Sequence, residues 1–214
     1  SDEKGTVLPG VYAAGEAACV SVHGANRLGT NSLLDIVVFG KRAGQSMVDY
    51  VTQTKPNTIS DSASDDLSKK IQNLIDKEHT DEFSVANIRK DLQESMEENA
   101  KIFRTKETLE KQTEILEELR ERYENVTIFD KSKVHNSELV EAIELDYLLD
   151  MSEATVASAL ARNESRGAHS RQDFPDRDDT NFMKHSFAFK KDNSANLKYK
   201  DVELGKYEPM ERKY

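Results

Sequence analysis

The chain has 214 residues, of which 36% are hydrophobic and 33% are charged, and its formal net charge is −10. This length suits one domain or two small ones, and the surplus of acidic residues argues against nucleic acid as a partner. A single cysteine, Cys19, excludes an intrachain disulfide framework. Because no apolar run approaches the roughly 18 residues of a membrane-spanning helix, no direct membrane span is expected.

The chain opens with a nearly uncharged segment that we expect to lie in a protein interior. Residues 6–50 contain only three basic and three acidic residues. Val7–Ala14 predicts a turn into a short buried strand that ends at Gly15. A glycine-rich loop follows, and then a helix from about Ser32 to about Val51. Since the first half of this helix is apolar nearly all round, it is expected to be buried.

A polar linker and a helical region come next. Residues 54–66 contain little that a core would bury. From residue 67 onward, apolar residues recur at spacings of three and four, which is typical of amphipathic helices. Four such stripes predict an antiparallel bundle of three or four helices. The stripes are Leu67, Ile71, Leu74 and Ile75; Ile88, Leu92, Met96, Ala100 and Phe103; Leu109, Leu116, Leu119 and Tyr123; and Leu139, Ile143, Tyr147, Met151, Ala154 and Ala157. Ser84 and Asn136 are start signals for the second and fourth helices.

The last part of the chain predicts a charged loop and a hairpin. The final helix is expected to end near Ser165, because Gly167 can adopt the left-handed conformation of a helix C-cap. Two alternating runs, Ser186–Phe189 and Leu197–Lys200, predict a β-hairpin around Asp192–Ser194. The fold class is therefore mainly α, with a strand, loop and helix of an α/β domain before the bundle and a short β-hairpin after it.

Arg27 is the first candidate binding residue, as the only lysine or arginine between Lys4 and Lys41. An arginine in a glycine-rich, largely apolar segment is costly to bury without an anion, and its planar guanidinium matches a carboxylate or phosphate. A structural ion pair with Glu16 or Asp35 explains it equally well.

Glu16 and the start of the helix are further candidates. A carboxylate that follows a strand and a glycine can accept hydrogen bonds from vicinal hydroxyls, although Glu16 can also simply pair with Arg27. Asn31 and Ser32 can cap the helix, and the amides of Ser32 and Leu33 would face whatever precedes it. Ordinary helix capping explains Asn31 and Ser32 equally. For His23, packing within the loop is favoured over a catalytic role.

Several other kinds of site are excluded. Thr30 stands where a phosphate-binding P-loop needs lysine, and no G-x-G-x-x-G fingerprint occurs, so this chain alone does not encode a complete dinucleotide site. No metal site is predicted, because His169 and His185 lack metal-ligand spacing. The acidic residues of the charged loop also lack the glycine and distal glutamate of an EF-hand. These acidic residues are Asp173, Asp176, Asp178 and Asp179.

Two long motifs carry a family resemblance. Residues 15–19 (Gly-Glu-Ala-Ala-Cys) and 23–35 (His-Gly-Ala-Asn-Arg-Leu-Gly-Thr-Asn-Ser-Leu-Leu-Asp) closely resemble the flavoprotein subunit of succinate dehydrogenase and fumarate reductase. The second motif is Glu-Ser-Arg-Gly-Ala-His-Ser-Arg at 164–171, followed by Asp173, Pro175, Arg177, Asp178 and Asp179. Phe103–Thr105, residues 136–145 and the terminal Arg-Lys-Tyr also match the family, whereas residues 57–80 depart most.

The resemblance implies an oxidoreductase that binds FAD, usually joined covalently to a histidine, and oxidises succinate to fumarate or catalyses the reverse. It implies that Glu16 contacts FAD, that Ser32 and Leu33 lie beside the flavin, and that Arg27 holds a substrate carboxylate. His23 and Asn31 are candidates of second rank. An iron–sulfur subunit and membrane anchor subunits are the implied partners. The implied location is peripheral, on the cytoplasmic face of a bacterial inner membrane or the matrix face of the mitochondrial one.

Family flavoproteins are far longer than this chain, so the resemblance implies a C-terminal fragment that is inactive alone. The histidine that links the flavin and the arginine that transfers a proton would lie upstream, which leaves no catalytic residue in this chain. Residues 1–53 would end the FAD-binding domain, 54–66 would be a linker, 67–165 the helical bundle, and 166–214 the charged loop and hairpin.

Two alternative functions stay open. L-aspartate oxidase shares the Asn-Arg-Leu and Ser-Arg-Gly pieces, but Val22–Ala25, Asp35 and the Arg-Asp-Asp run at 177–179 favour the respiratory enzyme. A non-catalytic helical interaction module would suit the bundle, but it would leave the glycine-rich segment unexplained.

Overall fold

The computed structural model describes residues 6–55, 60, 62–191, 194–206 and 208–210, which form two compact units, residues 1–73 and 74–214. The α-helices are α1 (Asn31–Gln53), α2 (Asp65–Asp76), α3 (Val85–Asn99), α4 (Lys106–Glu124), α5 (Ser137–Ala161) and α6 (Asp179–Phe182). Two short 3-10 helices are η1 (Gly15–Ala17) and η2 (Asp81–Phe83). The strands are β1 (Phe103–Arg104), β2 (Ser170–Arg171), β3 (Lys184–Lys191) and β4 (Ser194–Asp201).

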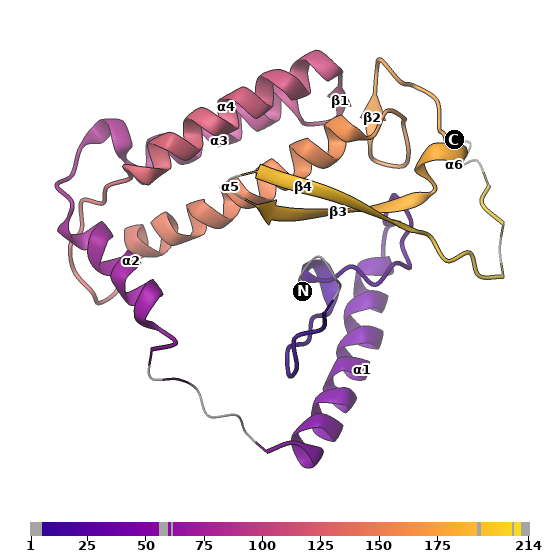
Figure 1. The fold of residues 1–214 in the computed structure, drawn as a ribbon, viewed down its shortest axis with the longest axis horizontal. Coiled ribbons are helices and arrows are strands. Elements are labelled where there is room, and N and C mark those ends of the chain that lie inside the picture. Colours follow the sequence, from indigo (N-terminus) through magenta and orange to yellow (C-terminus); the bar gives the residue numbers. More distant parts are fainter. Residues whose placement is uncertain (1–5, 56–59, 61, 192–193, 207, 211–214) are drawn as a thin grey trace. The chain divides into compact units, whose positions relative to one another are not determined.

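The predicted mainly α fold is confirmed (Figure 1). The division into four segments stays a prediction, and part of the expected linker lies outside the described residues.

In the first unit, the segment before the loop packs back along α1. The hydroxyl of Tyr12 donates to the carbonyl of Ser46 at 3.3 Å, and its ring meets that of Tyr50 edge-on with centroids 6.5 Å apart. Gly15 has a φ of +79°, and a Cβ at this position would lie 3.3 Å from Ile36 Cγ1. A side chain at this position would therefore be strained and crowded, which explains the glycine. The strand expected over Val7–Ala14 is wrong: the segment forms a turn and extended chain, and no described strand of this unit pairs with it.

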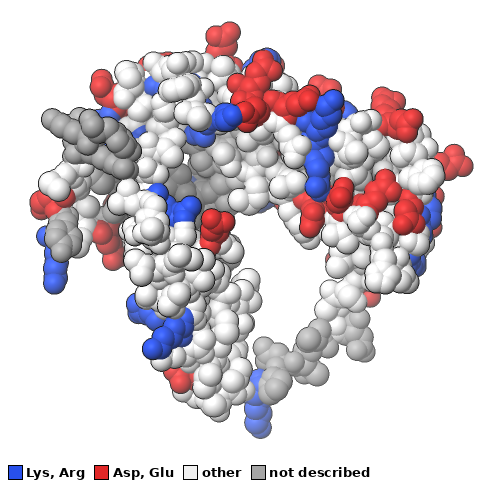
Figure 2. Space-filling view, turned by 180° about the vertical axis from the view of Figure 1, so that it is seen from behind, with Lys and Arg blue, Asp and Glu red and all other residues white. Residues whose placement is uncertain are grey.

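Helix α1 forms where the sequence predicts it, but its apolar face is exposed rather than buried. Leu33, Leu34 and Val37 are 68%, 62% and 67% exposed, and Asp35 is the helix residue that is buried. Figure 2 shows this helix as a largely uncharged surface, whereas charged side chains crowd the second unit. The expectation of burial is wrong because an apolar helix needs neighbours on several sides, and the described residues of this unit cover only part of it.

In the second unit, α3, α4 and α5 pack together as a bundle of three helices, and the β3–β4 hairpin packs on α5 (Figure 1). The predicted start signals are confirmed: the Ser84 hydroxyl accepts from the Asn87 amide, and the Asn136 side chain accepts from the Leu139 amide. The core is mainly aliphatic but contains polar groups: the Tyr123 hydroxyl bonds a carbonyl of α5, and the Asn99 and Gln112 side chains bond each other at 3.0 Å. Its hydrophobic residues include Val85, Ile88, Leu92, Leu109, Leu116, Leu119, Tyr123, Leu139, Ala142, Leu145, Leu149 and Val156.

Some details of the helical prediction are wrong. Phe103, the last residue of the second predicted stripe, lies in β1 and is 68% exposed. On α5, Tyr147 and Met151 of the predicted stripe are 58% and 65% exposed, because the buried face instead carries Ala142, Leu145 and Leu149. The helix also ends at Ala161 rather than near Ser165. Gly167 does have a positive φ, +59°. It belongs to a separate tight turn, in which the amides and carbonyls of residues 166 and 169 exchange two hydrogen bonds.

The predicted C-terminal hairpin is confirmed. Strands β3 and β4 are antiparallel, and the register places Ser186 opposite Tyr199. Residues Asp192 and Asn193, where the turn was expected, lie outside the described residues. A second, parallel pairing joins β1 to β2 and places Arg104 opposite Arg171. This pairing brings the end of α3 next to the charged loop 164–179.

Asp173 ties that loop to the first turn of α4. Its Oδ2 accepts from the Lys106 amide at 2.9 Å, and both of its oxygens accept from the Arg171 guanidinium at 2.8 Å. The hydrogen bonds from Arg171, which outweigh burial, hold the pKa of this carboxyl well below its usual range, and the Lys106 amide adds to them. A folded-state pKa below the unfolded value means that the ionised group stabilises the fold above about pH 4, and that this contribution is lost as the pH falls.

We expect Asp173→Asn to lower the free energy of unfolding by about 1 kcal/mol at pH 7, because a partly solvated carboxylate is screened. The difference from the parent chain should shrink as the pH falls below about 4. Urea unfolding followed by far-ultraviolet circular dichroism at pH 7 and pH 3 measures both effects. Asp176→Asn, a change at an exposed acid of the same loop, is the control. Equal losses for the two variants would contradict the assignment.

Candidate functional site

The glycine-rich loop between η1 and α1 holds several residues in left-handed backbone conformations. Gly24 has a φ of +62°, and Ser21 and Thr30 have φ values of +59° and +68°. A Cβ placed on Gly24 or Gly29 would meet no atom within 4 Å. The loop backbone is therefore open to a ligand at both glycines, which is the property expected of a segment that approaches a ligand closely.

Arg27 and Glu16 lie near one another in this loop. Arg27 Nη2 is 4.0 Å from Glu16 Oε1, and the two side chains are 47% and 86% exposed. A contact of this length between exposed groups is a weak ion pair. It leaves the donors of the guanidinium available for two hydrogen bonds to an incoming carboxylate. Of the two acidic partners considered for Arg27, the structure provides Glu16 and not Asp35.

Asp35 pairs with His23 instead. The His23 Nε2 to Asp35 Oδ2 distance is 2.6 Å, and the Asp35 side chain is only 7% exposed. The second carboxylate oxygen, Oδ1, is buried without a hydrogen-bond partner among the described residues. Because the two residues are 12 positions apart, their contact fastens the beginning of the loop to the first turns of α1. It thereby restrains the segment that carries Arg27.

The sequence patterns did not predict this pair, because His23 and Asp35 each drew attention for a separate reason. The available signal was that these are the histidine and the acid closest to Arg27 on either side within the uncharged segment.

The first turn of α1 begins without a side-chain cap. The N-cap is Thr30, whose side chain makes no capping hydrogen bond, so the expected capping by Asn31 and Ser32 is wrong. The Leu33 amide donates to the Thr30 carbonyl at 3.1 Å, and the Asn31 amide to Leu28 at 3.3 Å. Ser32 lies between Asn31 and Leu33 in the first helical turn, where the partial positive charge of the helix N-terminus favours an anion.

We expect His23→Ala to loosen the loop locally, because it leaves the buried Asp35 carboxylate without its partner. The loss of a buried charge-assisted hydrogen bond is worth about 1–3 kcal/mol. Amide hydrogen exchange of residues 24–35, followed by mass spectrometry, should therefore become at least about fivefold faster. His185→Ala in β3, which removes a histidine from the other unit, should leave this exchange unchanged. An unchanged rate in His23→Ala would show that the pair does not restrain the loop.

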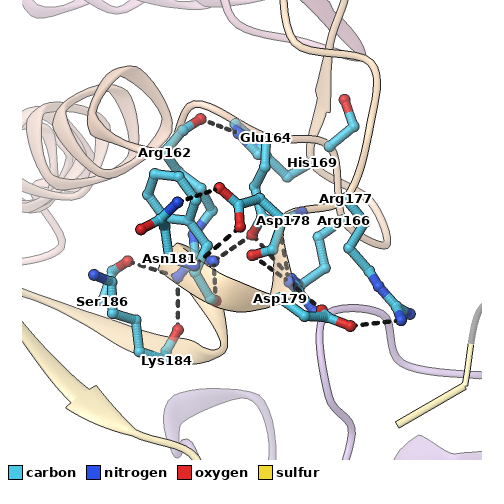
Figure 3. A network of polar contacts seen from close by, with 12 residues as sticks. Arg162, Glu164, Arg166, His169, Arg177, Asp178, Asp179, Asn181, Lys184 and Ser186 are labelled. Carbon is cyan, nitrogen blue, oxygen red and sulfur yellow. Dashed lines mark hydrogen bonds and ion pairs between the residues drawn. The ribbon is translucent and has the colours of Figure 1, made fainter.

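The second long motif forms a compact polar network in the other unit (Figure 3). Glu164 is fully buried at its centre, where its oxygens accept from Arg162 at 2.6 Å and from Arg166 at 2.9 Å. The amide of Asp178 donates to it at 2.8 Å. Burial alone would raise the pKa of Glu164, but the hydrogen bonds from Arg166, the Asp178 amide and Arg162 together outweigh it and lower the pKa. The network connects the end of α5 to the N-cap of α6, so its geometry indicates a structural role for this part of the motif.

Among the described residues, the structure has neither a metal-ligand cluster nor a helix that could span a membrane. No group of three or more histidine, cysteine, aspartate or glutamate side chains there has an arrangement that could hold a metal ion. Asp173, Asp178 and Asp179 of the acidic loop instead bond arginines or helix amides. None of the helices in the described ranges has the length and apolar content needed to cross a membrane.

Comparisons with known proteins agree on one family. Residues 89–214 match the family model described as the C-terminal region of fumarate reductase flavoproteins, and residues 1–33 match the FAD binding domain family. The chain is 45% identical, over 86% of its length, to the succinate dehydrogenase flavoprotein subunit of Rickettsia bellii (strain RML369-C), covering 30% of that protein. It is 42% identical, over 98% of its length, to the fumarate reductase flavoprotein subunit of Serratia sp. (strain ATCC 39006), covering 36% of it.

The fold gives the same result. The structure aligns with a mutant FrdA chain of E. coli quinol fumarate reductase at a TM-score of 0.87 and 36% identity, covering 95% of this chain and 35% of that one. The chain thus spans about a third of the length of the relatives it matches. With a family model that covers more than half of its residues, the chain belongs to the family of succinate dehydrogenase and fumarate reductase flavoprotein subunits.

Proposed function

We propose that this chain supplies one side of the FAD and dicarboxylate site of a flavoprotein that oxidises succinate to fumarate or catalyses the reverse. The observation that carries the proposal is the state of Arg27. It is half-exposed, held only loosely by Glu16 at 4.0 Å, and placed on an open glycine-rich loop that leads into an uncapped helix N-terminus. A dicarboxylate needs an arginine with free donors, and Arg27 is the base of the uncharged segment that offers them.

The residues present fit FAD. The Glu16 carboxylate is 86% exposed and free to accept hydrogen bonds from ribityl or ribose hydroxyls. The 68% exposed side chain of Leu33 presents an apolar surface to an aromatic ring system, and Ser32 begins the helix whose dipole favours negative charge. When bound, the flavin supplies the acceptor for a hydride equivalent from the substrate.

Within this site we assign one role to each candidate. Arg27 binds and orients a substrate carboxylate, Glu16 holds the cofactor, and Ser32 and Leu33 lie beside the flavin. His23 acts through Asp35, because their contact restrains the loop that carries Arg27. Asn31 keeps its second-rank place at the start of the helix. None of these groups is assigned the proton transfer of the reaction.

The exposed apolar face of α1 fits the same proposal. Contiguous exposed apolar residues on a helix are typical of an interaction surface. We assign this face to packing against the part of the FAD-binding domain that the longer relatives carry in addition. The face comprises Leu33, Leu34, Ile36, Val37 and Val38.

The proposed partners are an iron–sulfur subunit that receives the electrons and membrane anchor subunits. Support comes from the solved relatives, which include a quinol fumarate reductase with menaquinol molecules and a mycobacterial Sdh1 complex with UQ1. The proposed location is peripheral, on the cytoplasmic face of a bacterial inner membrane or the matrix face of the mitochondrial one. The 214 residues alone are expected to bind FAD weakly and not to turn over succinate.

A chimaera tests the proposal. Residues 1–214 replace the corresponding third of the Rickettsia bellii flavoprotein, and the product is assayed for bound flavin and for succinate oxidation with an artificial electron acceptor. We expect a flavin-loaded chimaera that oxidises succinate, with no turnover by the isolated chain. The equivalent exchange with the Serratia segment controls for the fusion itself. Oxidation of L-aspartate in place of succinate would favour the aspartate oxidase alternative. A chimaera that binds flavin but is inactive would favour the interaction-module alternative.

A further inference from the structure

The second unit contains a shallow cavity of about 430 Å³ beside α5 and β3, which is wide open to solvent. Its polar lining is basic or neutral and comprises Arg104, Arg162, His169, Thr155, Ser158 and Ser186. No acidic residue lines it, in a chain that carries ten more acidic than basic residues. The volume is in the range of small-molecule sites. A basic cavity in an acidic protein is the arrangement expected of an anion site.

Arg104 differs from the other arginines around this cavity in having no carboxylate partner among the described residues. Arg162 pairs with Glu164 at 2.6 Å, and Arg171 pairs with Asp173 at 2.8 Å. The Arg104 guanidinium instead donates to the carbonyl oxygens of Ala100 and Lys101, at 2.9 and 3.1 Å, and to an imidazole nitrogen. Burial without a carboxylate lowers the pKa of Arg104. A half-buried cation with only neutral partners is under-stabilised, and a bound anion would correct this.

His169 does not supply the missing negative charge. Its Nδ1 lies 3.0 Å from Arg104 Nη1. Its Nε2 lies 3.1 Å from the Arg162 carbonyl (Figure 3). Because guanidinium only donates and a carbonyl only accepts, this pattern assigns the hydrogen to Nε2 and makes the ring neutral. Burial, together with the charges of Arg104, Arg171 and Arg162, lowers the pKa of His169 and keeps it neutral near pH 7. The net charge of the cavity lining is therefore positive.

Hydroxyl groups complete the lining. Thr155 and Ser158 are three positions apart on α5, so both lie on one face of the helix. The Ser186 hydroxyl on β3 accepts from Arg162 Nη2 at 3.1 Å, which leaves its own hydrogen free to donate into the cavity. The Thr155 hydroxyl already donates to the Met151 carbonyl at 2.7 Å, so the Ser158 and Ser186 hydroxyls are the ones that remain as donors. One guanidinium and two hydroxyl donors are groups that bind tetrahedral or planar oxyanions.

We propose that this cavity binds a small oxyanion, a phosphate or a carboxylate, which Arg104 holds with the hydroxyl groups of Ser158 and Ser186. The proposal concerns the helical unit and stands independently of the flavin site. Both ligand classes present oxygen acceptors to the same donors, so the two are compared directly in the test.

The test measures binding of inorganic phosphate and of malonate to the 214-residue chain by isothermal titration calorimetry at fixed ionic strength, with chloride as the reference. Arg104→Gln should weaken binding of the preferred anion by about tenfold or more, because a charge-assisted hydrogen bond is lost. Lys101→Gln, an equal change of charge at an exposed neighbour, should leave binding unchanged. Arg104→Lys should retain part of the affinity.

A second measurement keeps the test decisive if the variants unfold. In the parent chain, the imidazole resonances of His169 should shift on titration with the preferred anion, whereas those of His135, an exposed histidine of the same unit, should not. Preference for phosphate or for malonate identifies the class of ligand, and either supports the site. Heats no larger than with chloride, or equal shifts at both histidines, would overturn it.

Discussion

Replacing Glu164 with glutamine is expected to lower the free energy of unfolding by about 3–5 kcal/mol, the largest loss for any single side chain discussed. Glu164 is fully buried, and its oxygens accept hydrogen bonds from Arg162, from Arg166 and from the Asp178 amide. Glutamine keeps the size of the side chain but removes the charge and turns one acceptor into a donor that faces guanidinium groups. Two arginines would then be partly buried without their shared carboxylate.

Chemical denaturation of Glu164→Gln at pH 7 measures this loss. Glu141→Gln on the exposed side of α5 is the control and should change stability by less than about 0.5 kcal/mol. Because partners lower the pKa of Glu164 in the folded state, its contribution is present above about pH 4 and is lost as the pH falls further. The two chains should therefore converge in acid. A loss of less than about 1 kcal/mol at pH 7 would show that the network tolerates a neutral centre.

Local sequence patterns predicted the elements of the helical unit well, because capping residues and turn residues act within a few positions. Ser84 and Asn136 start their helices as expected, and the hairpin pairs as its alternation predicts. The buried face of α5 was harder to assign. That helix is apolar on more than one side, since it packs on the bundle and on the hairpin, so spacing alone selected Tyr147 in place of Leu145.

The candidate site was predictable in its residues and not in its pairings. The isolation of Arg27 in an uncharged segment is visible in the sequence, and the structure confirms its contact with Glu16. The contact between His23 and Asp35 depends on how the loop folds back over 12 positions, which no local spacing rule describes. Likewise, Thr30 became the N-cap through a left-handed backbone conformation that its residue type does not favour.

The predicted burial of α1 was wrong for a different reason. An apolar sequence indicates that a helix packs against neighbours, but it does not indicate whether the same chain provides those neighbours. Leu33 and Val37 are exposed because the described residues of this unit do not cover them.

Arg27→Gln, placed in the Rickettsia chimaera, is expected to reduce kcat/KM for succinate by about a hundredfold or more. Removing one partner of a charge-assisted pair with a ligand costs about 2–5 kcal/mol, and each 1.4 kcal/mol is a factor of ten. Arg27→Lys keeps the charge but loses the two-pronged geometry, so it should retain more activity than Arg27→Gln. Steady-state kinetics with succinate, combined with the flavin absorbance of each variant, measure the effect at equal cofactor content.

Arg42→Gln is the matched control, because Arg42 lies on α1, where its guanidinium stacks over Phe39 at 5.9 Å. It should oxidise succinate normally. Glu16→Gln separates the two roles considered for Arg27. If Arg27 served only to pair with Glu16, Arg27→Gln and Glu16→Gln would each lower stability slightly. The flavin-loaded forms of the two variants would then have the same kinetics with succinate. If Arg27 binds the substrate, Arg27→Gln alone should raise KM for succinate sharply. Glu16→Gln should instead act mainly on flavin content, because the exposed Glu16 carboxylate is assigned to the cofactor and its 4.0 Å contact with Arg27 is weak.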